Sequence, residues 1–389
     1  FLIIAAVLVL MMTPGLAFFY GGLVSKKNVV NTMISVFIIC SLAIVLFVAF
    51  GYELCFNGNV AGIFSRVQHI FLSGSDLTKV VLKEQGITAA SYLLFEMMFA
   101  IITPALIAGA FAERMKFSAM LVFMVLWMFA VYVPVAHWVW EPTGWMFKDG
   151  VLDFAGGTVV HINAGVAGLV CALVLGKRVG FGKEAMPPHN LVLTMVGASM
   201  LWVGWFGFNA GSALEASGRA GMAMLVTQIA AGTAAVSWML AEWVMKKKAS
   251  VLGIVSGAVA GLVAITPAAG FVDPKGALLL GAVAGMVCYW GATGLKHWIG
   301  YDDSLDAFGV HGVGGIIGAI LTGPLAVVAI GGVEGSIVTQ SVAVAATVGY
   351  TLVVTFVLLK LVDLLLGLRV SAEEEREGLD LVLHGERVE

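Results

Sequence analysis

Long apolar stretches, each bounded by charged or turn-forming residues, dominate the pattern of this chain. A helix needs about 20 mostly apolar residues to cross the hydrocarbon core of a bilayer, and these stretches approach or exceed that length. Helices are the expected spanning form, because backbone polar groups in lipid must be satisfied within the segment. The pattern predicts an all-α membrane protein with eleven transmembrane helices, at about residues 1–24, 30–52, 90–111, 117–136, 154–176, 190–213, 220–245, 251–269, 276–296, 306–330 and 336–367.

The composition excludes a water-soluble enzyme. Of the 389 residues, 60% are hydrophobic and only 12% are Asp, Glu, Lys or Arg, whereas about 25% of a soluble domain is charged. Glycine is frequent, with 48 residues, which favours helices that pack closely through small faces. The four cysteines are scattered, so we expect no disulfide framework, metal site or cofactor. The net charge of −3 gives no indication of a nucleic-acid partner.

Basic residues predict the orientation in the cell membrane, because Lys and Arg concentrate in cytoplasmic loops. Alternate loops contain eleven and six of them, so the N-terminus is expected outside and the C-terminus inside. The first apolar run has no basic segment before it, and we interpret it as a span, not a signal peptide. The eleven are Lys26, Lys27, Arg114, Lys116, Lys177, Arg178, Lys183, Lys246, Lys247, Lys248 and Lys296, and the six are Arg66, Lys79, Lys83, Lys148, Arg219 and Lys275.

The chain divides into a membrane domain, residues 1–368, and a predicted cytoplasmic regulatory tail, residues 369–389. From 371 onward the tail holds seven acids and two arginines. Two interpretations are open, a solvated end or a docking element for a cytosolic partner. The loop at about 53–89 is the longest and most polar of the connections between the spans.

Two histidines lie deep in apolar runs and share a local pattern. His161 and His311 each begin a His-x3-Gly-x2-Gly sequence, and each follows an aspartate near the start of its span, Asp153 or Asp306. The fifth span runs inward and the tenth outward, and the helical rise places both rings near mid-membrane. This predicts an inverted five-plus-five repeat with a site at the interface of the halves and an extra C-terminal helix.

The surroundings of these histidines restrict what a pore could conduct. Buried histidines can simply bond neighbouring helices, but ionisable groups inside a membrane usually line a pathway. The spans show no ring of carboxylates and no carbonyl filter. A cation would lose its hydration there without replacement. We therefore expect passage of a neutral molecule, or of a cation that gives up its charge on entering.

Aromatic side chains gather toward the predicted outer side. Aromatic belts are common at membrane interfaces, but a cage of aromatic faces beside a hydroxyl group would also bind a small cation. The residues concerned are Phe99, Trp138, Trp140, Phe206 and Phe208, with Asn209 and Ser212 next along the chain.

At these residues the chain resembles the ammonium transporter family of Amt, Mep and Rh proteins, and in particular its Amt branch. The resemblance implies the eleven-helix inverted repeat, a homotrimer with one pore per subunit, block by a PII-type signalling protein, and a role for the tail in subunit coupling. The matching stretches are FYGGLVSKKN (19–28), FAERMK (111–116), DFAGGTVVHIN (153–163), GWFGFNAGS (204–212), TPAAG (266–270), DAFGVHG (306–312), and GLD and HGER within 378–387.

The resemblance also implies roles for individual residues of the outer half. Trp140, Phe99 and Ser212 resemble the site that recruits ammonium. Phe99 and Phe208 resemble a stacked aromatic gate below it. The stretch 140–153 is one residue longer than is usual in the family, which leaves Trp138 and Trp140 as alternatives for the outer site.

Deeper in the chain, His161 and His311 resemble the paired pore histidines, and Asp153 matches an aspartate needed for conduction, in a supporting or deprotonating role. Position 96 departs from the family, with Glu96 where we expect glutamine. This carboxyl group could strengthen cation attraction at the outer site, or it could be a neutral packing group at a subunit contact.

These observations predict transport of ammonium, which is recruited outside, deprotonated near Phe99 and Asp153, and passed as ammonia along the two histidines. Only an N–H bond is remade, so we expect a transporter and not an enzyme. Alternatives are an ammonium sensor and an Rh-like electroneutral gas channel. A sodium-coupled carrier would need interrupted mid-span segments, and we find no such pair in the sequence.

Overall fold

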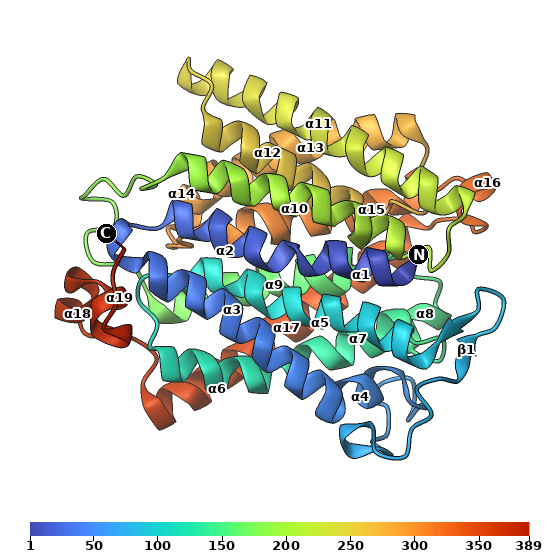
Figure 1. The fold of residues 1–389 in the computed structure, drawn as a ribbon. Helices are drawn as coiled ribbons and strands as arrows, with labels where there is room; N and C mark the ends of the chain where they lie inside the picture. Colours follow the sequence, from blue (N-terminus) through green and yellow to red (C-terminus); the bar gives the residue numbers. More distant parts are fainter. Residues whose placement is uncertain (389) are drawn as a thin grey trace.

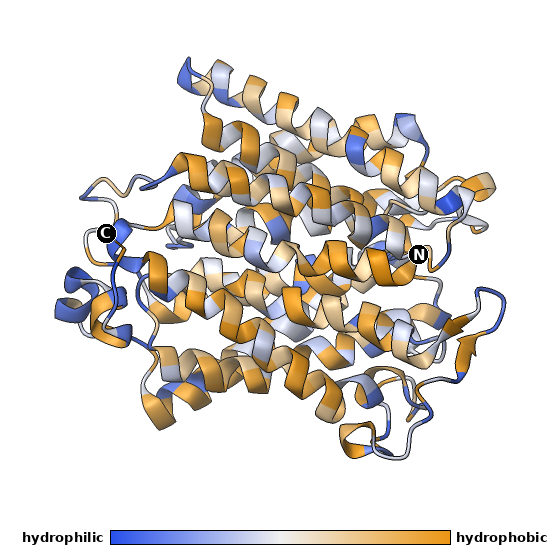
Figure 2. Cartoon of the chain, viewed as in Figure 1, coloured by the Kyte–Doolittle hydropathy of each residue, from blue (hydrophilic) through white to orange (hydrophobic). Residues whose placement is uncertain are grey.

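The computed structural model describes residues 1–388 as a bundle of long helices that run side by side (Figure 1). Within this range, ten helical segments are long and apolar enough to cross a membrane, and an eleventh, α12 (Val251–Ile265), is apolar but shorter. Hydrophilic residues gather at the two ends of the bundle (Figure 2). The eleven predicted spans are therefore confirmed.

The first five spans and their joints form one half of the bundle. Their α-helical parts are α1 (Leu2–Leu10), α2 (Met12–Leu23), α3 (Val29–Leu46), α4 (Tyr52–Phe56), α5 (Ala89–Phe111), α6 (Phe117–Trp127), α7 (Val133–Trp140) and α9 (Asn163–Leu175). Wider π-helical turns interrupt or begin three of these spans, at η2 (Phe47–Gly51), η4 (Met128–Tyr132) and η5 (Gly157–Ile162).

The next five spans repeat this plan, and α17 (Ile337–Leu366) follows them as the eleventh. A π-helical turn lies within the ninth span and another begins the tenth, as in the fourth and fifth. This recurrence supports the inverted repeat. The segments are α10 (Leu191–Gly211), α11 (Gly218–Lys246), α12, α13 (Pro274–Trp290), η6 (Gly291–Leu295), α14 (Lys296–Ile299), η7 (Phe308–Gly312) and α15 (Val313–Leu325).

The two ends of the chain lie at opposite ends of the bundle (Figure 1). We call the end with Phe1 the N-side and the end with the tail the C-side. Short elements on the N-side are η3 (Ile70–Leu72), the antiparallel strands β1 (Val80–Leu82) and β2 (Ile87–Thr88), α8 (Trp145–Lys148) and α16 (Val328–Gly331). On the C-side lie η1 (Lys26–Asn28), α18 (Ala372–Glu377) and α19 (Leu379–His384).

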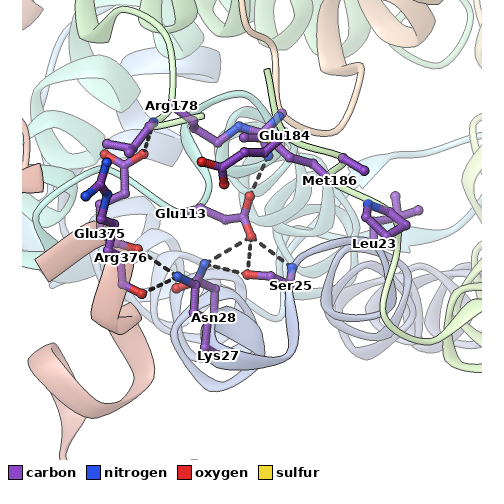
Figure 3. Close-up of a pocket in the computed structure, with 14 residues that line it drawn as sticks. Leu23, Ser25, Lys27, Asn28, Glu113, Arg178, Glu184, Met186, Glu375 and Arg376 are labelled. Atoms are coloured by element: carbon purple, nitrogen blue, oxygen red, sulfur yellow. Dashed lines mark hydrogen bonds and ion pairs between the residues drawn. The ribbon is translucent and has the colours of Figure 1, made fainter. Parts of the chain in front are cut away.

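The tail folds back onto the C-side of its own chain. The Asp380 carboxylate is buried and accepts the backbone N–H groups of Val30 (3.0 Å) and Asn31 (2.7 Å) at the start of α3. Lys27 donates to backbone carbonyls at the end of α18 (Figure 3). An acid at a helix N-terminus satisfies N–H donors that would otherwise be unpaired, and its negative charge interacts favourably with the helix dipole. The interpretation as a solvated end is therefore wrong, while docking of a cytosolic partner stays a prediction.

Four of the span boundaries differ from the predicted ones for local reasons. The fourth span continues to Trp140, because the indole N–H groups of Trp138 and Trp140 bond carbonyl oxygens of Ile63 and Asp153 within the protein. The eighth ends at Ile265, before Pro267. The fifth and tenth begin a few residues late, because the chain enters both through non-helical segments.

Candidate functional site

The two predicted histidines meet at the centre of the bundle. The Nδ1 atoms of His161 and His311 lie 3.3 Å apart, and their ring centroids 5.4 Å apart with planes 17° from parallel. Both side chains are buried, and Nε2 of His161 has no hydrogen-bond partner among residues 1–388. One ring comes from η5 and the other from η7, so the pair lies at the interface of the two halves.

Glycines allow this contact. A Cβ atom on Gly165 would overlap the backbone of Gly312, where α9 passes η7. On Gly315 it would lie 3.1 Å from the Cβ of His161 and 3.0 Å from the carbonyl oxygen of Gly157. Residues without side chains let helix backbones approach closely. The high glycine content thus has a specific use beside the histidine pair.

Asp153 anchors the helix that carries His161. Its carboxylate accepts four backbone N–H groups in succession, from Gly156 (2.8 Å), Gly157 (2.6 Å), Thr158 (2.7 Å) and Val159 (3.2 Å). These are the unpaired donors of a helix N-terminus. The contacts favour the supporting role of Asp153 over the deprotonating one, because its acceptor positions are already occupied by the backbone.

The counterpart of Asp153 in the second half is Asp303, and the prediction that Asp306 takes this place is wrong. Asp303 accepts the backbone N–H of Phe308 (2.7 Å) at the start of η7. The Asp306 carboxylate instead pairs with Lys296 at 2.8 Å. Asp306 has a positive φ of 59°, so the chain turns there between the anchoring aspartate and the helix. The sequence carried a signal for this, since Asp153 and Asp303 each precede their histidine by eight positions (161 − 153 and 311 − 303).

A column of aromatic rings leads from the N-side to the histidines. The centroids of Trp140 and Phe99 are 5.3 Å apart, those of Phe99 and Phe208 are 4.5 Å apart, and those of Phe208 and His161 are 6.1 Å apart. The predicted gate residues therefore contact each other directly. Trp205, which we did not single out, stacks on His161 at 5.3 Å. Its only sequence signal is its place within the GWFGFNAGS stretch.

A cavity of about 430 Å³ opens at the N-side end of this column. It is lined by the three residues predicted for the outer site, Trp140, Phe99 and Ser212. Trp138 lies elsewhere, because it packs against Tyr350 and donates to the backbone. The Ser212 hydroxyl donates to the carbonyl of its own helix at residue 208 (2.9 Å), which leaves its oxygen free to accept a donor from the cavity.

On the C-side, a cavity of about 220 Å³ reaches His311 and is lined by Lys296, Asp306 and Arg178 among others. The His311 and His161 rings and the Phe99–Phe208 pair thus separate it from the N-side cavity. Between the two cavities, the layer formed by these rings has few polar groups, which suits a small molecule that carries no charge at that depth.

A second C-side cavity, of about 240 Å³, lies beside the tail (Figure 3). Glu113 points into it and accepts from Ser25, Asn28 and Arg178. Arg178 also donates three hydrogen bonds to Asp302, two from its guanidinium and one from its backbone N–H. Burial alone would raise the pKa of both carboxyl groups, but the Arg178 guanidinium and the other donors outweigh it and hold each pKa below its ordinary value. Sequence reasoning missed this cluster, whose members are far apart in the chain.

Within residues 1–388, no group of three or more His, Cys, Asp or Glu side chains is arranged to hold a metal ion. The structure defines a multi-pass helical membrane protein made of two inverted halves, with cavities that approach paired histidines from both sides. The model of the Ammonium Transporter Family matches residues 1–389. The chain belongs to this family.

Three relatives show how far the likeness extends. An ammonium transporter of Bacillus subtilis is 48% identical over all of this chain and 97% of its own length. The crystal structure of Saccharomyces cerevisiae Mep2 is 34% identical with a TM-score of 0.87, covering 95% of this chain and 86% of that one. A solved structure described as a sensor Amt protein is 27% identical with a TM-score of 0.91, covering 98% and 97%.

Proposed function

We propose that this protein transports ammonium across a cell membrane by recruiting the cation, removing its proton and passing ammonia along the histidine pair. Trp140 and Phe99 attract the cation through their ring faces, and Ser212 accepts one N–H. Cation–π attraction contributes about 0.5–2 kcal/mol, depending on desolvation. Ammonium and potassium are similar in size, but only ammonium has a proton to lose, so this route excludes potassium.

Below the recruitment site, the Phe99–Phe208 pair acts as the gate, and ammonia moves past His161 and His311. Neutral imidazoles offer one donor and one acceptor each, which suits ammonia. Asp153 supports this passage by holding the helix of His161 in place. Reprotonation takes place in the C-side cavity. The protein remakes no bond other than N–H, and we propose no enzymatic activity.

The N-side faces the outside of the cell and the C-side faces the cytoplasm, as the excess of Lys and Arg in the C-side loops supports. The protein works as a homotrimer with a pore in each subunit. Residues 1–368 form the transport domain, and 369–389 form a regulatory tail near which a PII-type protein binds. Docking of Asp380 on α3 supports a tail that is coupled to the membrane domain.

The observation that carries the proposal is the 3.3 Å contact between His161 and His311 at the end of an aromatic column. The test uses the purified protein in proteoliposomes on a solid-supported membrane. An ammonium pulse is expected to produce a sustained current, and a potassium pulse none. Absence of an ammonium current together with absence of ammonium-dependent pH change inside the liposomes would refute transport.

A second candidate is ammonium sensing, favoured by the likeness to the sensor Amt protein. A sensor that binds without conducting would give only a transient charge displacement on the same pulse. An Rh-like gas channel would give an internal pH change without current. One experiment therefore distinguishes the three activities.

A further inference from the structure

Glu96 lies in the wall of the N-side cavity, three residues before Phe99 on α5. Residues three apart on a helix lie on the same face. Glu96 therefore lies on the same face of α5 as Phe99 and lines the same cavity as the aromatic rings of the recruitment site. This position does not favour the interpretation of Glu96 as a packing group at a subunit contact.

Tyr92 is the side-chain hydrogen-bond neighbour of the Glu96 carboxyl group, and one of the two carboxyl oxygens is left without a partner in the described part of the chain. The side chain is 7% exposed, and its Oε2 atom has no hydrogen-bond partner among residues 1–388. Leaving a buried acceptor unsatisfied costs about 1–3 kcal/mol, and more when it is charged. Such a cost is offset if a donor arrives from the cavity, and ammonium brings four N–H donors.

The cationic side chain of the same cavity does not neutralise Glu96 by an ion pair. Arg219 lies between the rings of Phe154 and Phe271, with its guanidinium carbon 5.0 Å and 4.9 Å from their centroids. Its Nε donates to the carbonyl of Gly270. The cavity thus has a fixed cation on one wall and a buried carboxyl group without a hydrogen bond to Oε2 on another.

We propose that Glu96 is an ammonium-binding residue of the N-side cavity, whose ionised carboxylate accepts an N–H of the cation held by Trp140, Phe99 and Ser212. This inference rests on the proposed function and adds a charged acceptor to an aromatic site. Hydrogen bonds to ionised acceptors are roughly twice as strong as neutral ones. Potassium has no N–H to donate, so it would be attracted to this carboxylate by charge alone.

Ionisation of Glu96 should make ammonium affinity depend on external pH. As the pH falls through the pKa of this group, the carboxylate is protonated and the apparent KM for ammonium rises. Other titratable or charged groups lie around it, and all of them are unchanged in the Glu96→Gln variant. They are Tyr52, Glu53, Cys55, Tyr92, Tyr132, His137, Glu141, Asp153 and Arg219.

The test compares wild-type protein with the Glu96→Gln variant, which keeps the shape and one acceptor oxygen but removes the charge. Ammonium currents are recorded in proteoliposomes between about pH 5 and pH 8, where ammonium stays almost wholly protonated. We expect the KM of Glu96→Gln at the upper end of this range to rise about tenfold, a loss typical of one charge-assisted hydrogen bond. The maximal current should change little, and the KM should no longer depend on pH.

A matched control is Glu84→Gln, the same change at an exposed position of the N-side hairpin, which should leave both the KM and its pH dependence as in the wild type. Glu96→Asp keeps the charge and should retain the pH dependence, which tests the idea even if Glu96→Gln folds poorly. A wild-type KM and pH profile in Glu96→Gln would overturn the inference. An inactive wild type would instead count against transport itself.

Discussion

Asp153 and Asp303 are equivalent anchors of the two halves, because each accepts backbone N–H groups at the start of the helix that holds a central histidine. Each stands eight residues before that histidine (161 − 153 and 311 − 303). The histidine pair is therefore positioned from both sides by carboxylates that bind backbone and not solvent. The first half has more of these contacts, because Asp153 accepts four backbone N–H groups, whereas Asp303 accepts from Phe308 and has a further backbone contact with Ala307.

This asymmetry predicts unequal effects of removing the two charges. Asp153→Asn should lower stability by about 1–3 kcal/mol, since several charge-assisted bonds are weakened together, and should reduce the ammonium current at least tenfold. Asp303→Asn should have smaller effects on both. Thermal unfolding in detergent and current amplitude in proteoliposomes measure them. Equal tolerance of both changes would show that the two anchors do not position the histidines.

Gly165 tests whether close helix approach is needed for conduction. Gly165→Ala adds a Cβ that overlaps the Gly312 backbone, so the α9 and η7 backbones must separate and the imidazoles lose contact. We expect a loss of current of at least tenfold and a stability loss of about 1–3 kcal/mol, as for overpacked cores. Gly232→Ala on α11 is the control, since a Cβ there meets nothing within 4 Å. The account fails on this point if both variants conduct equally.

The Arg178 cluster predicts the direction of the acid dependence of stability. Glu113 and Asp302 have folded pKa values below their ordinary values of about 4. Their stabilising contribution is therefore complete above about pH 4–5 and is lost as the pH falls through the lowered pKa values. The Tm of the wild type in detergent should fall over that acid range.

Arg178→Met should reverse this behaviour. It leaves two buried carboxylates without their cation, which costs about 3–5 kcal/mol near neutral pH. Mild acidification then protonates the carboxylates and relieves the cost, so the Tm of the variant should rise or stay level where that of the wild type falls. Parallel Tm curves for both proteins would contradict the role assigned to the cluster.

Asp380 tests the docking of the tail. Asp380→Ala removes the acceptor for the first N–H groups of α3 and should release α18 and α19 from the C-side. Limited proteolysis should then cleave the tail at least tenfold faster than in the wild type. The control is Glu373→Ala, which removes an exposed acid of α18. Asp363→Ala would not serve as a control, because the Asp363 side chain caps the end of α17. Equal cleavage of Asp380→Ala and Glu373→Ala would argue against docking through Asp380.

Much of the fold followed from apolar run length alone, because spanning a bilayer demands long apolar helices. The pairing of His161 with His311 could be predicted since both histidines belong to matching patterns in opposite halves. Glu113, Arg178 and Asp302 could not be associated in this way. They lie in three separate loops, and only the packing of the helices brings them together.

Helix boundaries near the site were predicted less well. Apolarity does not distinguish a helical residue from one in a non-helical segment buried in protein, such as 154–156, which is held by the Asp153 carboxylate and the Pro267 carbonyl. The choice between Trp138 and Trp140 likewise depended on which indole found a partner outside the cavity, and this is a matter of tertiary contact.

The most direct test of the account is the current carried by a variant in which His161 and His311 are both replaced by alanine. The protein, reconstituted in proteoliposomes beside the wild type, should give an ammonium current reduced at least tenfold or accompanied by a potassium current, because the route restricted to ammonia is lost. His69→Ala, at the N-side loop, should behave as the wild type. An undiminished ammonium current with continued exclusion of potassium in the double variant would contradict the central claim.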